Sequence, residues 1–143
     1  MEIERKFLIK ELPDLSQYEH HNIEQGYLST KPVLRIRKKD DLAFITIKGG
    51  GMLAREEHEF QIPMEEYEHL LPKIDGRPIT KTRYIIPFNK YTIELDVFQG
   101  HKEGLIMAEV EFESLEEANS FVPPEWFGED VTMQRQYHNS QMI

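Results

Sequence analysis

Like charges separated by one residue recur along this chain, and this pattern constrains the fold more than any other feature. Six segments carry such a pair: Glu2/Glu4, Arg35/Arg37, Glu57/Glu59, Lys81/Arg83, Glu94/Asp96 and Glu109/Glu111. The residues between them are mostly apolar, as Ile36, Leu95 and Val110 illustrate. Because side chains two positions apart in a strand point to the same face, each segment predicts a strand with one charged and one apolar face.

Two interpretations of the charged faces are open. In an ordinary antiparallel sheet they would face water, and the apolar faces would form the core. However, two like charges about 6.7 Å apart repel by roughly 2.5 kcal/mol at an effective dielectric constant near 20, and a solvated surface usually intersperses its signs. Clustered carboxylates match Mg²⁺ or Mn²⁺, while paired Lys and Arg match phosphate oxygens. A metal-bound polyphosphate would complement both sets.

The pattern is also compatible with a sheet closed into a barrel, which would turn the charged faces into a lumen and remove exposed edges. We therefore predict a mainly β (α+β) fold in which short helices cover apolar outer faces. Strands are expected at residues 2–9, 22–29, 33–39, 43–48, 55–62, 79–88, 91–98 and 105–113. Helices are expected at 63–71 and from the capping box at Ser114 toward Phe121, and the tail after Asp130 is also expected to be helical.

Length and composition limit the class of protein. A chain of 143 residues fits one domain, which we place at residues 1–143. The formal net charge of -9 argues against binding of a nucleic-acid duplex or an anionic membrane by the whole surface. The absence of cysteine excludes disulfides, thiolate nucleophiles and zinc sites built on sulfur. No secretory signal or membrane-spanning apolar run is evident, so we expect a cytoplasmic protein.

The charged motifs follow one another in a defined order. The chain opens with Glu2-Ile3-Glu4-Arg5-Lys6, and Arg35-x-Arg37, Lys48, Arg55-x-Glu57-x-Glu59, Lys81-x-Arg83, Glu94-x-Asp96 and Glu109-x-Glu111 follow. This ordered set, which spans nearly the whole chain, resembles the CYTH superfamily of triphosphate tunnel metalloenzymes. The resemblance implies an eight-stranded antiparallel barrel, a divalent metal and hydrolysis or cyclisation of a triphosphate. The short chain is most similar to the compact bacterial branch, in which inorganic tripolyphosphatase activity is common.

The resemblance also implies roles for individual residues. The residues expected to bind the phosphates of the substrate are Lys6, Arg35, Arg37, Lys48, Arg55, Lys81 and Arg83. Glu2, Glu4 and Glu111 are expected to hold Mg²⁺ or Mn²⁺, with Glu57, Glu59, Glu94, Asp96 and Glu109 as further or second-metal ligands. The candidate catalytic set is Glu2, Glu4, Lys6, Glu94, Asp96, Glu109 and Glu111. Water attacking phosphorus in line would be the nucleophile, so no covalent intermediate is expected.

Several alternatives stay open at this point. The same fold could serve a thiamine or nucleoside triphosphatase, a class IV-type adenylate cyclase, or a noncatalytic polyphosphate-binding module. An apolar outer face could support a homodimer. Gly49-Gly50-Gly51 lacks the spacing of a Walker loop and is interpreted as a flexible connection. Gln25 and Tyr27 lie in phase with a lumen-facing strand, where they could contact substrate or simply pack.

Overall fold

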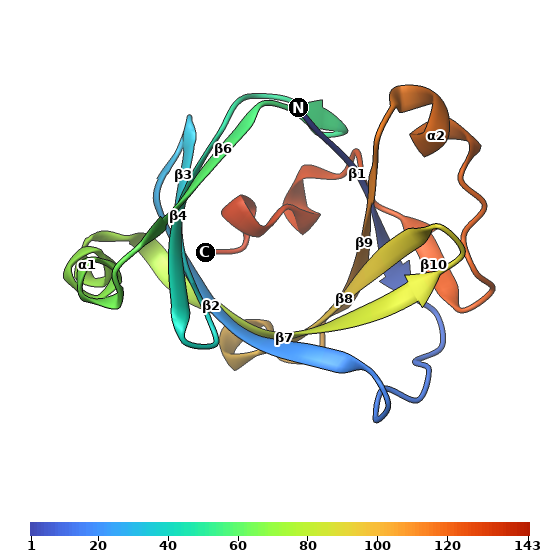
Figure 1. Ribbon diagram of the computed structural model, residues 1–143, viewed down its shortest axis with the longest axis horizontal. Helices are drawn as coiled ribbons and strands as arrows, with labels where there is room; N and C mark the ends of the chain where they lie inside the picture. The colour runs from blue at the N-terminus through green and yellow to red at the C-terminus, as the bar shows by residue number, and fades with distance from the viewer.

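The computed structural model describes residues 1–143, whose strands form a nearly closed antiparallel barrel (Figure 1). The strands are β1 (Glu2–Ile9), β2 (Glu19–Thr30), β3 (Val33–Lys39), β4 (Leu42–Lys48), β5 (Ala54–Arg55), β6 (Glu57–Ile62), β7 (Asp75–Phe88), β8 (Tyr91–Gln99), β9 (Ile106–Phe112) and β10 (Phe127–Asp130). The helices are α1 (Met64–Leu70) and α2 (Leu115–Ser120), with 3₁₀ turns η1 (Leu71–Lys73), η2 (Gly100–Lys102), η3 (Arg135–Tyr137) and η4 (Asn139–Gln141).

The order of the strands explains how the barrel closes. Hydrogen-bonded neighbours run β10-β1-β9-β8-β7-β2-β3-β4-β6, and β5 pairs with β1. Only Glu56 separates β5 from β6, so this stretch joins β1 at one edge of the sheet to β4 at the other. When β5 and β6 are counted as one interrupted strand, eight strands surround the lumen. The short β10 pairs with β1 on the same side as β5 does, but farther along β1. The predicted barrel is confirmed.

A glycine permits the turn that leads into this closure. Gly51 has φ +113°, a conformation that side chains with a Cβ rarely adopt. A Cβ at this position would also collide with the carbonyl oxygen of Ala54, the first residue of β5. The glycine run therefore has a structural role at Gly51 in turning the chain from β4 toward β1.

The apolar strand faces point outward, as predicted, and the two helices cover them. On one side Phe7, Ile93 and Leu95 pack in a buried cluster with Ala118 of α2 and Phe121. On the other side Tyr67 of α1 packs over Ile36 and Ala43. The hydroxyl of Ser114 accepts a 3.1 Å hydrogen bond from the backbone N–H of Glu117, which confirms the predicted N-cap of α2.

The C-terminal segment was only partly anticipated. It contains the 3₁₀ turns η3 and η4 and no α-helix, and it runs across the interior of the barrel, where Figure 1 shows the C-terminus. Val131 and Met142 are buried there against Tyr27, Ile79 and Phe98. One end of the lumen is therefore filled by an apolar plug, and the charged part of the lumen lies beyond it.

Smaller differences concern where strands begin. β2 and β7 start at Glu19 and Asp75, earlier than predicted, and β10 was not predicted. The added start of β7 includes Asp75, which pairs with Tyr27 beyond a register shift in β2. No helix in the structure combines the length and apolar character that a membrane crossing requires.

Candidate functional site

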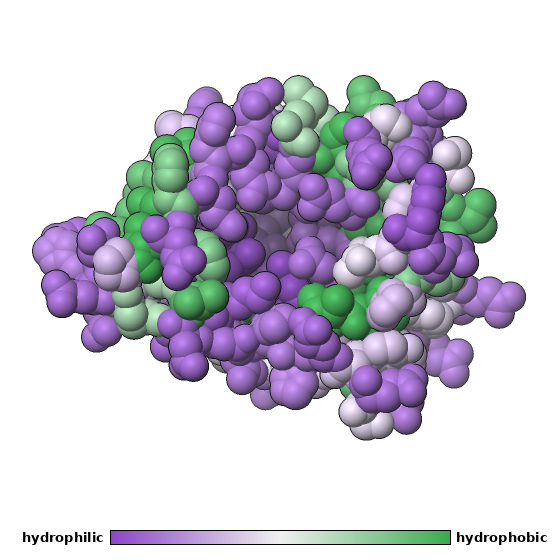
Figure 2. All heavy atoms as spheres, in the orientation of Figure 1, coloured by the Kyte–Doolittle hydropathy of each residue, from purple (hydrophilic) through white to green (hydrophobic).

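A cavity of about 240 Å³ occupies the charged part of the lumen and opens at the hydrophilic hollow in Figure 2. Only three of the twenty residues that line it are hydrophobic. The lining residues are Glu2, Glu4, Lys6, Tyr27, Val33, Arg35, Arg37, Lys39, Phe44, Lys48, Arg55, Glu57, Glu59, Lys81, Arg83, Glu94, Glu109, Glu111, Asn139 and Ser140. Eight cations thus face seven carboxylates in one cavity of a protein whose net charge is -9.

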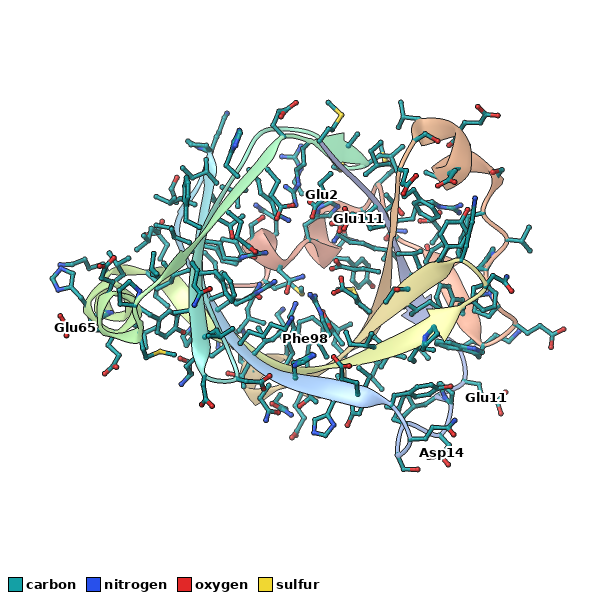
Figure 3. All side chains as sticks on the ribbon, in the orientation of Figure 1. Glu2, Glu11, Asp14, Glu65, Phe98 and Glu111 are labelled. Atoms are coloured by element: carbon teal, nitrogen blue, oxygen red, sulfur yellow. The ribbon has the colours of Figure 1, made fainter.

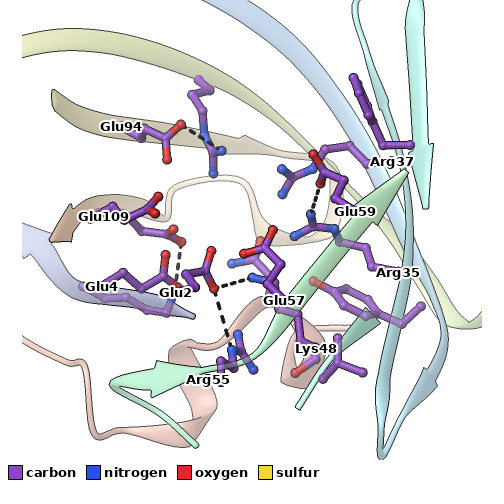
Figure 4. A pocket seen from close by; sticks show the side chains of 18 of the residues that line it. Glu2, Glu4, Arg35, Arg37, Lys48, Arg55, Glu57, Glu59, Glu94 and Glu109 are labelled. Atoms are coloured by element: carbon purple, nitrogen blue, oxygen red, sulfur yellow. Dashed lines mark hydrogen bonds and ion pairs between the residues drawn. The ribbon is translucent and has the colours of Figure 1, made fainter. Parts of the chain in front are cut away.

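The two signs occupy different parts of the wall. Arg35, Arg37 and Lys39 on β3 and Lys81 and Arg83 on β7 flank β2, so these three adjacent strands form a basic wall. The adjacent strands β8, β9 and β1 present Glu94, Glu109, Glu111, Glu2 and Glu4, which form an acidic wall. Figure 3 shows Glu2 and Glu111 directed into the lumen, and Figure 4 shows both walls from close by. The predicted segregation of charge inside an enclosed cavity is confirmed.

The register places like charges directly opposite one another in the acidic wall. Glu4 is the partner of Glu111 between β1 and β9, and Glu94 is the partner of Glu109 between β8 and β9. Such cross-strand pairs of like charge are destabilising. A sheet that keeps them retains an excess of negative charge that a bound cation would neutralise.

Two carboxylates of the acidic wall have raised pKa values, whereas Lys6, Arg83 and Lys81 outweigh burial and keep the pKa of Glu109 below its ordinary value. Partial burial, together with the charges of Glu2, Glu4 and Glu94, raises the pKa of Glu111 above its ordinary value. Burial also raises the pKa of Glu2, and a hydrogen bond with Glu57 adds to this effect, although Lys48 opposes it. Both residues therefore hold a proton more readily than an exposed glutamate does.

Two cations of the basic wall show the complementary effect, whereas Asp96 and Glu94 outweigh burial and raise the pKa of Arg83. Burial, aided by repulsion from Arg35 and Arg83, lowers the pKa of Arg37 to about 9. Burial also lowers the pKa of Lys81 to about 7, because the attraction of Asp96 only partly offsets burial and the repulsion from Arg83 and Arg37. These cations lack sufficient negative charge around them, and a bound polyanion would supply it.

Asp96 lies behind the basic wall and outside the cavity lining. Its side chain is 1% exposed; it accepts hydrogen bonds from Arg83 Nε and Nη2 at 2.8 and 2.9 Å and lies 2.8 Å from Lys81 Nζ. Burial disfavours the carboxylate, but Arg83 and Lys81 outweigh it and keep the pKa of Asp96 below its ordinary value. Asp96 therefore orients the two cations from behind.

Lys6 lies within the acidic wall. Its ammonium group donates to Glu4 at 2.9 Å and to Glu109 at 3.0 Å. Burial alone would lower the pKa of Lys6, but Glu109 and Glu4 raise it well above the ordinary value. This buried triad holds Glu4 and Glu109 of the acidic wall in place.

Other carboxylates pair with cations on adjacent or nearby strands of the barrel wall. Glu2 lies 3.0 Å from Lys48 Nζ and 3.9 Å from Arg55 Nε. Glu59 lies 3.3 Å from Arg35, and Glu94 lies 3.3 Å from Arg83. Figure 4 marks these contacts, which show that several carboxylates of the cavity now serve as counterions for the basic groups.

The C-terminal segment contributes polar atoms to the floor of the cavity. Asn139 Oδ1 accepts hydrogen bonds from Lys81 Nζ at 2.9 Å and from Gln25 Nε2 at 3.3 Å. Gln25 Oε1 in turn accepts from Arg37 Nε and Nη2 at 2.9 and 2.7 Å. Gln25 therefore links the tail to the basic wall, while Tyr27 lines the cavity and also packs in the plug.

The structure brings together nearly all the residues singled out from the sequence. Each residue expected to bind phosphate lines the cavity, as does each expected metal ligand except Asp96. Lys39 was missed, although it lies two residues after Arg37 and so shares its strand face. Phe44, Val33, Asn139 and Ser140 were also missed, and for Asn139 and Ser140 the sequence carries no periodic signal.

The donor set of the acidic wall fits a divalent cation in its chemistry. Carboxylate oxygens are the ligands that Mg²⁺ and Mn²⁺ prefer, and burial together with neighbouring carboxylates raises the pKa values of Glu2 and Glu111. No three carboxylate or imidazole groups, however, are arranged closely enough in the structure to hold a metal ion. The negative charge of the acidic wall suits a divalent cation. Some of its carboxylates form ion pairs with Lys6, Lys48 and Arg55 in this structure.

Comparisons with known proteins find relatives along nearly the whole chain. Residues 1–141 match the family model described as the CYTH domain. An inorganic triphosphatase from Nitrosomonas europaea is 42% identical over an alignment of 146 residues that covers 99% of this chain and 95% of the relative. An inorganic triphosphatase from Acetivibrio thermocellus is 34% identical, with 99% and 92% covered.

A solved structure shows the same similarity in three dimensions. The crystal structure of the inorganic triphosphatase NE1496 superimposes with a TM-score of 0.74 at 40% identity, covering 99% of this chain and 93% of that chain. The match over almost the entire sequence, the shared fold and the segregated charges of the lumen lead to one conclusion: this chain belongs to the CYTH domain family.

Proposed function

We propose that this protein is a divalent-metal-dependent hydrolase that cleaves inorganic triphosphate and releases orthophosphate. The observation that carries this proposal is the meeting of a basic wall and an acidic wall in one small cavity with almost no apolar lining. Similar proteins in two bacteria are inorganic triphosphatases, which supports the same activity here. An inorganic substrate also suits the lining, because an organic group would require apolar surface.

The basic wall would bind the phosphate groups. Arg35, Arg37 and Arg83 can each donate two parallel hydrogen bonds to phosphate oxygens, while Lys81 and Lys48 act as point charges. A bound triphosphate would restore the pKa values of Arg37 and Lys81 toward their ordinary range, since it supplies the negative charge that these groups lack. The same cations would stabilise the charge that develops on the leaving phosphate.

The acidic wall would hold the metal that membership of the family implies. We assign Glu2, Glu4 and Glu111 as its ligands, with Glu57, Glu59, Glu94 and Glu109 as further or second-metal ligands, and we propose Mg²⁺ or Mn²⁺. Asp96, which the sequence grouped with these ligands, is instead proposed to position Lys81 and Arg83 because both of its oxygens already face these cations. When bound, the metal would neutralise charge on the phosphate oxygens.

The reaction needs a water molecule in line with the bond that breaks. The water oxygen forms a new bond to the terminal phosphorus, the bridging P–O bond breaks, and orthophosphate and pyrophosphate result. The water proton passes to a carboxylate of the acidic wall. No side chain is required as a covalent nucleophile.

One experiment tests the proposal against its alternatives. Purified protein is incubated with tripolyphosphate, ATP or thiamine triphosphate, each with Mg²⁺ or Mn²⁺, and the products are identified. We expect orthophosphate from tripolyphosphate at the highest rate. Pyrophosphate with a cyclic nucleotide from ATP would indicate a cyclase, preference for thiamine triphosphate would indicate an organic substrate, and binding without turnover would indicate a noncatalytic module.

Adjacent residues of β3 provide a matched pair of variants. Arg37→Ala removes a cation that lines the cavity, whereas Lys38→Ala removes one that does not. We expect the Arg37 variant to lose at least about 100-fold in kcat/KM, as removal of one preorganised charge contact in an active site commonly does. The Lys38 variant should keep its activity, and equal activity of the two variants would remove the basic wall from the proposal.

Several finer points remain proposals. We propose that residues 1–143 act as one domain in the cytoplasm, in keeping with the absence of cysteine. Homodimer formation through an outer apolar face is a further prediction, testable by light scattering. Neither point affects the assignment of the cavity.

A further inference from the structure

A second cavity lies beside the tunnel at the end where the C-terminal segment enters. It has a volume of about 710 Å³ and is enclosed by the turn between β2 and β3, the glycine run after β4 and the segment from η3 to η4. Its lining residues are Thr30, Lys31, Pro32, Val33, Lys48, Gly49, Gly50, Gly51, Met52, Arg55, Arg135, His138, Ser140 and Gln141. We call it the side cavity.

The charge of the side cavity is unusual for this protein. Lys31, Lys48, Arg55 and Arg135 line it, and no carboxylate does. The tunnel cavity, by contrast, balances its cations with carboxylates, and the chain as a whole has a net charge of -9. An all-basic concave surface in an acidic protein concentrates anions locally.

The two cations at its rim have no counterions within the protein. Lys31 and Arg135 are exposed, and neither forms an ion pair. Lys48 and Arg55, deeper in the cavity, share a single carboxylate, Glu2. The positive charge of the side cavity is therefore available to a ligand.

The side cavity adjoins the tunnel cavity directly. Val33, Lys48, Arg55 and Ser140 line both of them. An anion that extends from the tunnel past Lys48 and Arg55 would therefore meet Lys31 and Arg135 next. The apolar plug closes the axis of the barrel, so the side cavity offers a lateral route beside it.

We propose that the side cavity is a second binding site for inorganic phosphate groups, which takes the part of a linear polyphosphate that extends beyond three phosphates. The inference rests on the proposed function, because it assumes that the tunnel binds the first phosphates of the chain. Orthophosphate released by the reaction has the same phosphate oxygens and is the other ligand that this site would accommodate. A nucleic acid fits less well, since no Phe, Tyr or Trp side chain lines the cavity to stack on a base.

Direct binding measurements test the site without any need for turnover. Wild-type protein and the double variant Lys31→Gln/Arg135→Gln are titrated calorimetrically with tetrapolyphosphate, tripolyphosphate and orthophosphate in EDTA, which prevents hydrolysis. We expect the variant to bind tetrapolyphosphate roughly three- to tenfold more weakly, as the loss of two exposed charge contacts predicts. Tripolyphosphate affinity, and its turnover with Mg²⁺, should change less than about twofold.

A second double variant controls for net charge. Lys73→Gln/Arg77→Gln removes one lysine and one arginine that are also exposed but that line neither cavity. It should bind all three ligands as the wild type does, and the melting temperatures of both variants should match that of the wild type.

The outcomes separate the possibilities. Weaker binding confined to orthophosphate would keep the phosphate site but assign it to the released product. Unchanged binding of all three ligands, or an equal loss for tripolyphosphate and tetrapolyphosphate, would overturn the proposal. Wild-type protein that binds tetrapolyphosphate but hydrolyses nothing would refute the proposed activity and leave this test of the side cavity valid.

Discussion

Replacement of Asp96 by asparagine tests whether this residue orients cations or binds metal. The carboxylate is buried behind the basic wall and contacts Lys81 Nζ and Arg83 Nε, both at 2.8 Å. Asparagine has nearly the same shape but no charge, and its amide group would direct hydrogens toward at least one of these cations. The substitution therefore leaves the buried Lys81 without its counterion and leaves Arg83 with only the contact to Glu94 at 3.3 Å.

The expected cost follows from this burial. Removing one partner of a buried ion pair typically costs about 3–5 kcal/mol, because the remaining charge stays desolvated. For a chain of this size, at about 3 °C per kcal/mol, the melting temperature should fall by roughly 10–15 °C. Lys81 has a pKa of about 7, so it is largely neutral in the folded protein at pH 9. At that pH, removal of the Asp96 charge therefore takes little stabilising attraction from Lys81. The destabilisation should therefore be larger at pH 6 than at pH 9.

Glu94→Gln is the matched control, two residues away on the same strand. Glu94 contacts Arg83 at 3.3 Å, but 37% of its side chain is exposed, so its loss should cost less than about 1 kcal/mol. Thermal unfolding of both variants gives the stability, and Mn²⁺ titration of tripolyphosphatase activity gives the metal requirement. We expect Asp96→Asn to lower stability with an unchanged metal requirement, and Glu94→Gln to do the reverse. An Asp96 variant of wild-type stability that needs more Mn²⁺ would refute the positioning role.

Three further predictions test the walls and the tail. Because Lys81 has a pKa of about 7, binding of tripolyphosphate at pH 8 should be accompanied by proton uptake; calorimetry in buffers of different ionisation enthalpy should detect it, and Lys81→Gln should reduce it. Asn139→Ala removes the acceptor of Lys81 Nζ and should raise KM for tripolyphosphate by at least about tenfold, as loss of one buried hydrogen bond to a charged group predicts, whereas Ser120→Ala on α2 should not. EDTA should abolish turnover, and Mg²⁺ or Mn²⁺ should restore it better than Ca²⁺, whose larger and more flexible coordination suits compact phosphate sites less well.

The sequence predicted the strands because their side chains alternate so regularly. In β3 the charges of Arg35 and Arg37, and in β9 those of Glu109 and Glu111, alternate with apolar residues, and the structure places these elements within one residue of the expected bounds. The same alternation assigned charged faces to the lumen, since like charges have no reason to gather on a solvated surface. Residue type and period were sufficient for this part of the fold.

The register between strands could not be derived in the same way. That Glu4 lies opposite Glu111, and Glu94 opposite Glu109, depends on which residues pair across strands distant in the sequence. Asp96 illustrates the consequence, because it has the same spacing as its neighbour Glu94 but lies deeper in the barrel, where Lys81 and Arg83 surround it. Spacing identifies the face of a residue but not its depth along the lumen.

The C-terminal segment escaped prediction for a different reason. Its contacts come from single residues of an irregular chain: Val131 and Met142 fill the end of the lumen and Asn139 reaches Lys81. Such a segment has no period, and its role depends on a cavity that exists only after the barrel has closed. Local sequence patterns cannot reveal it.

The arrangement of apolar residues explains how the fold tolerates so many charged side chains inside the barrel. In most small barrels the interior is the core, so that charges placed there would remove the main source of stability. Here the largest apolar cluster lies outside the wall beneath α2, a smaller one lies beneath α1, and within the lumen only the plugged end is apolar. Burial of these outer faces stabilises the barrel independently of the tunnel. The like-charged neighbours of the acidic wall can therefore be kept for a ligand, and a ligand that neutralises them should stabilise the folded protein in proportion to its affinity.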